Sequence, residues 1–218
     1  PLSKEDIDLG IKYLVMLTKD GIIKKTALTE FENVRKSGLI AITLKKGDLL
    51  KEVCKSTGQD EAIIVTKKGI AIRFKEKDIR EMGRSAAGVR GIRLKSGDRV
   101  IGAGIIKAKS GELKAKSDKE YLLVVTENGY GKRTDLKEYR IQGRGGAGIK
   151  TSKITPKTGD LIASFILNGD EEDLIVISQK GQVIRSQISQ IAKLSRSTQG
   201  VRLMRLDPGD KVASATCI

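Results

Sequence analysis

Four copies of one pattern account for almost the whole chain. Each copy begins with a run of aliphatic and β-branched residues that ends in a turn at a glycine, namely Gly21, Gly69, Gly129 and Gly181. A second glycine follows at Gly38, Gly88, Gly148 and Gly200, and a Gly-Asp pair comes third, beginning at Gly47, Gly97, Gly159 and Gly209. Three anchors in one order, with a period of about 50 residues, predict four copies of one structural unit.

The segments between these anchors have the composition of short β-strands. The chain holds only three prolines and shows no convincing helical periodicity. Turns such as Lys19-Asp20-Gly21 are typical of hairpins in which glycine adopts positive φ. We therefore expect an all-β protein whose repeats are sheets of about four strands arranged radially, because one small sheet cannot bury both faces alone. Helical structure is expected only as single turns near Thr29–Phe31 and Ile188–Ile191.

The repeats set the expected domain organisation. Residues 1–10 are interpreted as a leader or the remnant of a preceding repeat, and 11–218 as one domain. Its four repeats span about 11–60, 61–118, 119–171 and 172–218. A start at Pro1 suggests a piece of a longer polypeptide. The second repeat is longer because of a lysine-rich segment, 107–117, interpreted either as a solvated loop or as an extra phosphate-contacting arm.

The charge balance indicates a polyanionic partner. Lys and Arg number 42 against 27 Asp and Glu, which gives a formal charge of +15 at pH 7. A surplus of this size is typical of proteins that bind nucleic acid or an anionic membrane. No apolar run of about 18 residues is present and the first residues are charged, so neither a membrane span nor a secretory signal is predicted. We expect a soluble, cytoplasmic protein.

The composition argues against catalysis, metal binding and base stacking. There is no histidine, and Cys54 and Cys217 lack the spacing of zinc ligands, so we expect two buried thiols, no metal and no catalytic residue. No convincing nucleophile arrangement supports a hydrolase. Three Phe, four Tyr and no Trp argue against recognition of single strands by stacking.

Basic residues recur at fixed positions of the repeat. After the first glycine come Lys24, Lys25, Arg73, Lys132, Arg133 and Arg185, and before the second glycine come Arg35, Arg84, Arg144 and Arg196. Two residues past the second glycine come Arg90, Lys150 and Arg202, and five past it come Arg93, Lys153 and Arg205. Such rows predict a basic belt that contacts DNA phosphates without reading bases. The alternative is that exposed strands simply favour Lys and Arg to avoid aggregation.

A glycine-rich segment in the third repeat is a second candidate binding element. It comprises Gln142, Gly143, Arg144, Gly145, Gly146, Ala147 and Gly148. Glycine lets a backbone approach phosphate closely while an arginine supplies charge. Alternatively, the glycines only satisfy the geometry of a tight loop. A nucleotide-binding loop is disfavoured because the strand-to-helix context is missing.

This segment is similar to the seven-residue box, Gln-Arg-Arg-Gly-Gly-Lys-Gly, of the C-terminal domain of DNA gyrase A. Residues 80–90, 124–134 and 198–206 resemble blade signatures of that family, and the resemblance covers 11–218. It implies a β-pinwheel, a propeller-like disc whose blades exchange strands and whose rim wraps duplex DNA positively with little sequence specificity. It also implies a non-catalytic part of an ATP-dependent type II topoisomerase, with the rest of gyrase A and gyrase B as partners. The cleavage tyrosine and the ATP site lie outside such a domain, which needs no cofactor.

Two departures from the family pattern qualify this resemblance. The family usually has six blades with the intact box on the first, whereas four repeats occur here and the box-like segment lies in the third. Gly143 and Ala147 also stand where the box carries Arg and Lys. The chain is therefore expected to be the last four blades with a degenerate box. The equivalent domain of topoisomerase IV, or a propeller-like protein-interaction scaffold with an incidental basic rim, are the alternatives.

Overall fold

The computed structural model describes residues 6, 8–32, 36–108, 120–169 and 171–218. These residues divide into two compact units. The first comprises 1–64, 72–108 and 141–148, and the second comprises 65–71, 109–140 and 149–218. Most of the lysine-rich segment at 107–117 lies outside the described residues.

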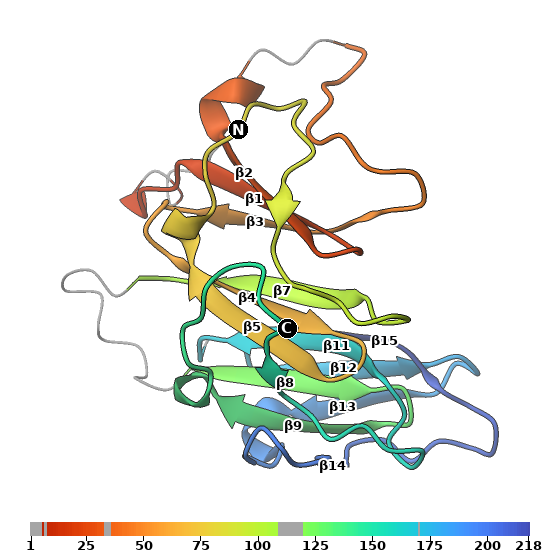
Figure 1. The fold of residues 1–218 in the computed structure, drawn as a ribbon. Helices are drawn as coiled ribbons and strands as arrows, with labels where there is room; N and C mark the ends of the chain where they lie inside the picture. Colours follow the sequence, from red (N-terminus) through yellow and green to blue (C-terminus); the bar gives the residue numbers. More distant parts are fainter. Residues whose placement is uncertain (1–5, 7, 33–35, 109–119, 170) are drawn as a thin grey trace. The chain divides into compact units, whose positions relative to one another are not determined.

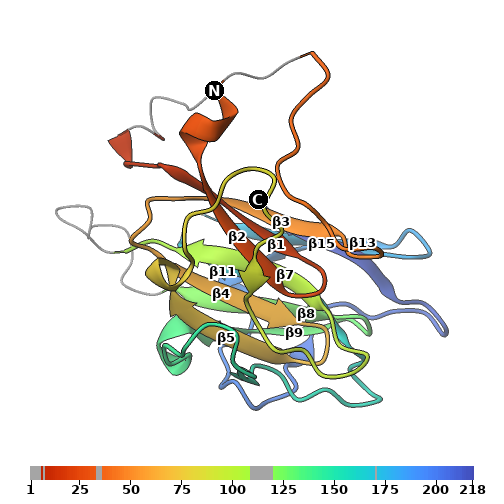
Figure 2. The ribbon, with the colours of Figure 1, turned by 45° about the horizontal axis from the view of Figure 1, so that its top comes forward.

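The described residues form four antiparallel sheets (Figure 1). The first contains β1 (Tyr13–Thr18), β2 (Ile22–Ala27), β3 (Leu50–Ser56) and β6 (Val89–Arg90) in the order β3-β1-β2-β6. The second contains β4 (Glu61–Thr66), β5 (Ile70–Lys75), β7 (Val100–Ile106) and β10 (Ile149–Lys150) in the order β10-β5-β4-β7. In both views β1, β2 and β3 lie side by side (Figures 1 and 2).

The remaining two sheets belong to the third and fourth repeats. The third contains β8 (Tyr121–Thr126), β9 (Tyr130–Asp135), β11 (Leu161–Leu167) and β14 (Val201–Arg202) in the order β11-β8-β9-β14. The fourth contains β12 (Asp173–Ser178), β13 (Val183–Gln187) and β15 (Val212–Cys217) in the order β13-β12-β15. The expected all-β fold with four sheets is confirmed. Among the described residues the last sheet has three strands rather than the expected four.

Each of the first three sheets is completed by a short strand from the next repeat. In the first sheet β6 pairs with β2, so that Val89 lies opposite Ile23. Strand β10 pairs with β5 in the same way, and β14 pairs with β9, where Val201 lies opposite Gly131. The strand exchange implied by the family resemblance is therefore confirmed. The second anchor glycine recurs because it leads into this exchanged strand.

The first anchor glycines occupy equivalent hairpin turns. Their φ angles are 80°, 77°, 77° and 86°, for Gly21, Gly69, Gly129 and Gly181 respectively. In each turn the glycine N–H donates to the carbonyl three residues earlier, as from Gly21 to Thr18 at 3.0 Å. The Thr18 hydroxyl also accepts from the Ile22 N–H at 3.2 Å, which explains why Thr or Ser precedes every such glycine by three residues.

Two of the Gly-Asp anchors tie the last strand of a repeat to its own hairpin turn. The Asp48 carboxylate accepts from the Asp20 N–H at 3.0 Å, and the Asp210 carboxylate accepts from the Lys180 N–H at 3.1 Å. The Asp160 carboxylate instead accepts at 3.0 Å from the ammonium of Lys68, which lies in the hairpin turn of the preceding repeat. A carboxylate that accepts from a backbone N–H replaces the missing partner of a turn. The aspartate of the anchor is thus structural.

Consecutive residues of the central strands β1, β4 and β8 are buried, so both faces of these strands contribute to the core. In the second unit Leu123 and Val125 of β8 pack in one cluster with Leu174 and Val176 of β12. In the first unit Met16 and Leu17 of β1 are almost fully buried. Burial of a side chain of this size stabilises a fold by about 1.5–3 kcal/mol relative to exposure.

In the described part of the chain, one 3₁₀-helical turn follows the second strand of each repeat. These turns are η1 (Leu28–Phe31), η2 (Glu76–Asp78), η4 (Leu136–Glu138) and η5 (Ile188–Gln190). The expected turns near 29–31 and 188–191 are confirmed. The other two, Glu76–Asp78 and Leu136–Glu138, were not predicted from the sequence.

We predict that Gly200→Ala lowers the free energy of unfolding by about 2–4 kcal/mol, because a side chain there is strained and also clashes. Gly200 has φ 86°, and a Cβ at this position would lie 2.6 Å from the Gly131 carbonyl oxygen. Gly209→Ala is the matched control, since Gly209 has φ 74° and nothing lies within 4 Å of its Cβ position. Urea unfolding should show that the control substitution lowers the free energy of unfolding by only about 1 kcal/mol. Equal losses would contradict a clash between the new Cβ and Gly131 of β9.

Candidate nucleic-acid interface

Two of the arginines that precede the second glycine, Arg144 and Arg196, are bonded to backbone carbonyls. The Arg144 guanidinium donates from Nε to the Asp78 carbonyl at 2.9 Å and from Nη1 to the Arg90 carbonyl at 2.5 Å. The Arg196 guanidinium donates from Nη1 to the Lys150 carbonyl at 3.0 Å. Because Arg90 and Lys150 lie on exchanged strands, each of these arginines fixes the exchanged strand of the preceding repeat.

These arginines are therefore less exposed than the sequence suggested. The side chains of Arg84 and Arg196 are 34% and 32% exposed, and their Nε atoms lie 4.0 Å from Glu30 and Glu138 respectively. Loss of a hydrogen bond from a charged group typically costs about 1.5–3 kcal/mol. Substitution of Arg144 or Arg196 should lower stability as well as charge. Arg35, the first member of this set, lies outside the described residues.

A second group of cations is exposed to solvent. It consists of the residues two and five positions past the second glycine, Arg90, Arg93, Lys150, Lys153, Arg202 and Arg205. We call these six residues the exposed basic set. In each exchanged strand the apolar residue is followed by the cation, so the alternation of a strand directs the cation to the opposite side. The same local sequence, Val-Arg or Ile-Lys, thus builds both the sheet contact and the charge.

Two lysines expected to contact phosphate are buried. The side chains of Lys24 and Lys132 are fully inaccessible, and their ammonium groups bond within the chain. The Lys132 ammonium donates to the carbonyls of Ser195, Arg196 and Thr198 at 2.5, 2.8 and 3.0 Å, and contacts the Thr198 hydroxyl at 3.1 Å. Burial lowers the pKa of Lys132 to about 8, against the opposing effect of Glu138.

Lys24 occupies the equivalent place in the first repeat. Its ammonium donates to the Ala41 carbonyl at 2.7 Å and to the Arg84 carbonyl. Burial likewise lowers the pKa of Lys24. In this conformation neither Lys24 nor Lys132 is open to a phosphate.

The next position of the same strands is also engaged within the protein. The Arg73 Nε lies 2.6 Å from a Glu61 carboxylate oxygen. The Arg185 guanidinium contacts the Asp173 carboxylate at 2.5 and 2.8 Å, although its side chain is 68% exposed. Bonds of this kind favour a structural role for this row over an open phosphate contact.

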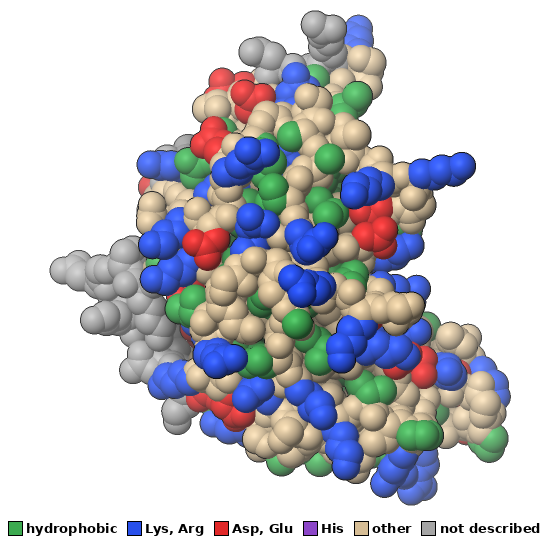
Figure 3. Space-filling view, in the orientation of Figure 1, with side chains coloured by type: hydrophobic (Ala, Val, Ile, Leu, Met, Phe, Trp, Pro, Cys, Tyr) green, Lys and Arg blue, Asp and Glu red, His purple; other side chains and the backbone are tan. Residues whose placement is uncertain are grey.

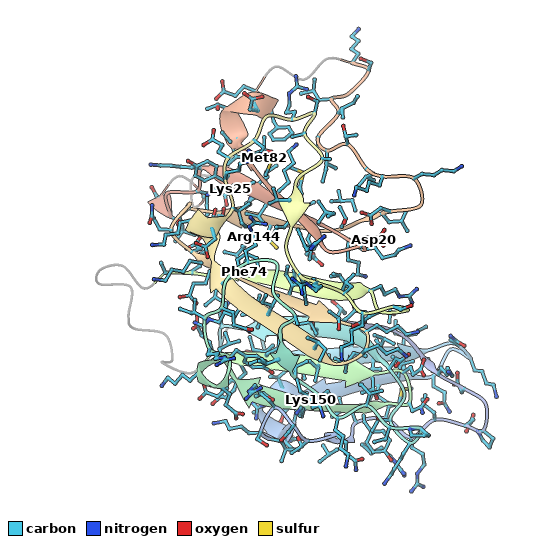
Figure 4. All side chains as sticks on the ribbon, in the orientation of Figure 1. Asp20, Lys25, Phe74, Met82, Arg144 and Lys150 are labelled. Carbon is cyan, nitrogen blue, oxygen red and sulfur yellow. The ribbon has the colours of Figure 1, made fainter. Side chains whose placement is uncertain are left out.

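Lys25 and Arg133 complete this row. Lys25 is 7% exposed and lies 3.8 Å from the Glu76 carboxylate, beside Met82, whose N–H donates to the Lys25 carbonyl at 2.9 Å (Figure 4). The Arg133 guanidinium donates to the carbonyls of Ile191 and Ser189 at 2.9 and 2.8 Å. Both cations therefore tie one repeat to the turn of the next.

The box-like loop at 142–148 is held by main-chain bonds. The Gly145 N–H donates to the Gly91 carbonyl, and the Gly146 carbonyl accepts from the Arg93 N–H, both at 2.8 Å. A Cβ on Gly145 would lie 3.3 Å from the Arg90 carbonyl oxygen, and φ is 79°. Close packing of backbones therefore accounts for this glycine. Gly143 and Ala147 are exposed and Gln142 is half-buried.

Sequence inspection missed one further row of cations. Lys45, Lys95 and Lys157 stand two residues before the glycine of the Gly-Asp anchor, and all three are exposed. Their register was the available signal. In the second unit Lys157 lies 5.6 Å from the centre of the Tyr130 ring, and the Arg202 guanidinium donates to the Tyr130 hydroxyl at 3.2 Å. The Arg202 bond lowers the pKa of the Tyr130 phenol.

The surface view agrees with a basic interface. Lys and Arg side chains are spread over the face shown in Figure 3, where Asp and Glu are fewer. Cations displayed at this density raise the local concentration of a polyanion and speed its association. Each unit taken by itself thus displays exposed cations, such as Arg93 in the first and Lys153 in the second, that suit binding of phosphates by charge.

Other kinds of site receive no support from the described residues. No three His, Cys, Asp or Glu side chains gather among them as metal ligands would. No helix among these residues is long and apolar enough to cross a membrane. Cys54 and Cys217 are free and half-buried rather than fully buried as expected, and burial raises their thiol pKa values to about 11 and about 12.

The fold defines a class, a propeller-like series of antiparallel sheets linked by strand exchange. The family described as DNA gyrase C-terminal domain, beta-propeller, matches residues 12–52, 60–107, 120–168 and 172–218. One matched segment corresponds to each repeat. The chain belongs to this family.

Relatives and solved structures agree with this assignment. The DNA gyrase A protein of Staphylococcus epidermidis is 41% identical over 213 residues, which are 98% of this chain and 23% of that protein. The DNA gyrase A protein of Staphylococcus aureus is 40% identical over 205 residues, 94% of this chain and 22% of that protein. The chain thus spans about a quarter of the length of these relatives.

The fold is shared with two related solved structures. A gyrase A C-terminal domain superposes with a TM-score of 0.79 at 25% identity, covering 95% of this chain and 66% of that one. The C-terminal domain of a DNA topoisomerase IV superposes with a TM-score of 0.84 at 24% identity, covering 95% and 62%. At this identity the topoisomerase IV likeness shows the fold alone.

Proposed function

We propose that the chain is a non-catalytic module that binds, bends and wraps duplex DNA, and that it supports negative supercoiling as part of a gyrase holoenzyme. The observation that carries the proposal is the exposed basic set, which recurs at the same two positions in three successive repeats. Cations spaced by the repeat can each contact a phosphate without reading a base. Little sequence preference is therefore expected.

The proposed partners are inferred from the relatives. The staphylococcal relatives are DNA gyrase A proteins, and this chain corresponds to about a quarter of their length. We infer that the remainder of gyrase A and gyrase B supply cleavage and ATP hydrolysis, in the bacterial cytoplasm. No cofactor is proposed for this chain. The identity with gyrase A relatives favours gyrase over topoisomerase IV.

We predict a steep salt dependence of binding to random duplex DNA. If each of the six cations of the exposed basic set neutralises one phosphate, the slope of log K against log salt is about −5. Affinity then falls by about three decades for a fourfold rise in salt. Fluorescence anisotropy with two unrelated duplexes of about 40 base pairs measures both the slope and the sequence preference.

This titration also separates the proposal from its rival. A protein-interaction scaffold with an incidental basic rim would bind weakly and with a shallow slope. A slope shallower than about −2, or a strong preference for one duplex, would contradict binding through several phosphates.

A further inference from the structure

The position three residues after the first glycine alternates in chemistry along the chain. It holds Lys24, Ile72, Lys132 and Ile184 in the four repeats. Both lysines are fully buried, and both donate to the carbonyl of the arginine that begins the next repeat's second-anchor turn. A buried lysine at a position that takes isoleucine in other repeats calls for a reason beyond charge.

The contacts of Lys132 supply that reason. Its ammonium contacts four acceptors in the turn at 195–198, three of them backbone carbonyls. The two residues before it on β9 hold the strand that comes after this turn. Gly131 pairs with Val201, and the Tyr130 hydroxyl accepts from Arg202. Three successive residues of β9 thus hold the segment 195–202, which leads to the cations Arg202 and Arg205.

The repeats with isoleucine show the alternative solution. Ile72 is fully buried, and its side chain lies 3.5 Å from where a Cβ on Gly146 would be. That turn contains Gly145 and Gly146, and main-chain bonds hold it. A glycine-rich turn can pack its backbone against an aliphatic side chain. The turns at 84–87 and 196–199 carry side chains instead, and their inward carbonyls need a donor because buried carbonyls are seldom left unpaired.

We propose that Lys132, and Lys24 at the equivalent place, are positioning residues that fix the turn and the exposed cations after it for contact with DNA phosphates. Lys132 acts on Arg202 and Arg205, and Lys24 acts on Arg90 and Arg93. The inference rests on the proposed DNA binding for its function. The hold of the lysine ammonium on the turn, which we call the clamp, does not depend on DNA binding.

The test of the proposal is a double-mutant cycle on duplex affinity. Lys132→Met is expected to weaken binding about tenfold at low salt, because the two cations no longer hold one geometry. In a background that carries Arg202→Gln and Arg205→Gln, the same substitution should change affinity less than about twofold, because its targets are gone. Lys137→Met, an exposed lysine on η4, is the control for loss of one charge and should change affinity less than about twofold in either background.

Amide hydrogen exchange tests the clamp without DNA. Lys132→Met should speed exchange of the amides at 196–202 at least about tenfold, and leave those of β12 unchanged. Lys132→Ile, the residue found at this position in two other repeats, gives a second variant if the methionine variant fails to fold. Lys132→Arg should restore much of the affinity, since it keeps a charged donor.

The outcomes divide between the two proposals. Equal weakening in both backgrounds, or no faster exchange at 196–202, overturns the positioning role even if the native chain binds DNA well. A native chain that fails to bind duplex with a steep salt slope overturns the proposed function, while the exchange experiment still decides whether Lys132 holds the turn.

Discussion

Reversing the charge of Arg93, Lys153 and Arg205 together is expected to weaken duplex binding roughly a thousandfold at about 50 mM salt. The estimate comes from counterion release, because three lost phosphate contacts reduce the slope of log K against log salt by about 3. These residues lie five positions past the second glycine in three successive repeats, and all three are exposed. Anisotropy titrations at several salt concentrations measure both affinity and slope.

The matched control reverses three exposed cations that do not belong to these rows, Lys51, Lys77 and Lys137. Both triple variants change the net charge by the same amount. If binding depended only on the +15 charge of the whole chain, the two variants would lose affinity equally. We expect the control to lose less than about a tenth as much. Equal losses would show that the rows have no special part in binding.

Thermal unfolding separates the exposed set from the turn arginines. Exposed charges contribute about 0–1 kcal/mol each, so the Arg93, Lys153 and Arg205 triple should melt close to the native chain. Arg196→Gln should melt lower, because it removes the bond to the Lys150 carbonyl. The two groups of cations have similar spacing in sequence, yet one builds the fold and the other displays charge.

The fold was predictable from the sequence because its signals are local. A Thr or Ser three residues before Gly21 or Gly129 marks a hairpin within one short segment, and the structure places each such glycine at a turn with positive φ. Strand exchange was different. Nothing within Gly88-Val89-Arg90 says that its partner strand is β2, which lies in the preceding repeat; the family resemblance supplied it.

The site was predictable only in part, because burial depends on distant neighbours. Lys24 and Lys132 look like surface residues beside Lys25 and Arg133. Their carbonyl partners include Arg84 and Arg196 of the next repeat, 60 and 64 residues further along the chain. Isoleucine at the same position of the other repeats was the one sequence signal of burial. The exposed lysines two residues before the Gly-Asp anchors can be recognised as a row only when the repeats are aligned with one another.

The second large effect concerns wrapping rather than binding. Closed circular DNA relaxed by a separate topoisomerase in the presence of this chain is expected to show a raised linking number after deproteinisation. Smooth bending of 20–30 base pairs by 40–90° costs about 1–6 kcal/mol, so contacts from several repeats are needed to offset it. The exposed basic set offers two cations in each of three repeats. A bend that continues out of plane from repeat to repeat constrains writhe, and the raised linking number is the result expected if the wrap has the positive sense that the family resemblance implies.

The shift per bound molecule should be smaller than for a six-bladed domain. Gly143 and Ala147 stand where the box of the family carries two cations. The guanidinium of Arg144 is already bonded to the carbonyls of Asp78 and Arg90. A ladder of topoisomers titrated with protein at low salt measures the shift, with a gel shift run in parallel to fix the number of molecules bound. The Arg93, Lys153 and Arg205 reversal is the negative control and should leave the ladder at the position of relaxed DNA. If the gel shift saturates with the native chain while the centre of the ladder stays in place, the chain binds duplex without wrapping it, and the exposed basic set is a phosphate-binding surface only.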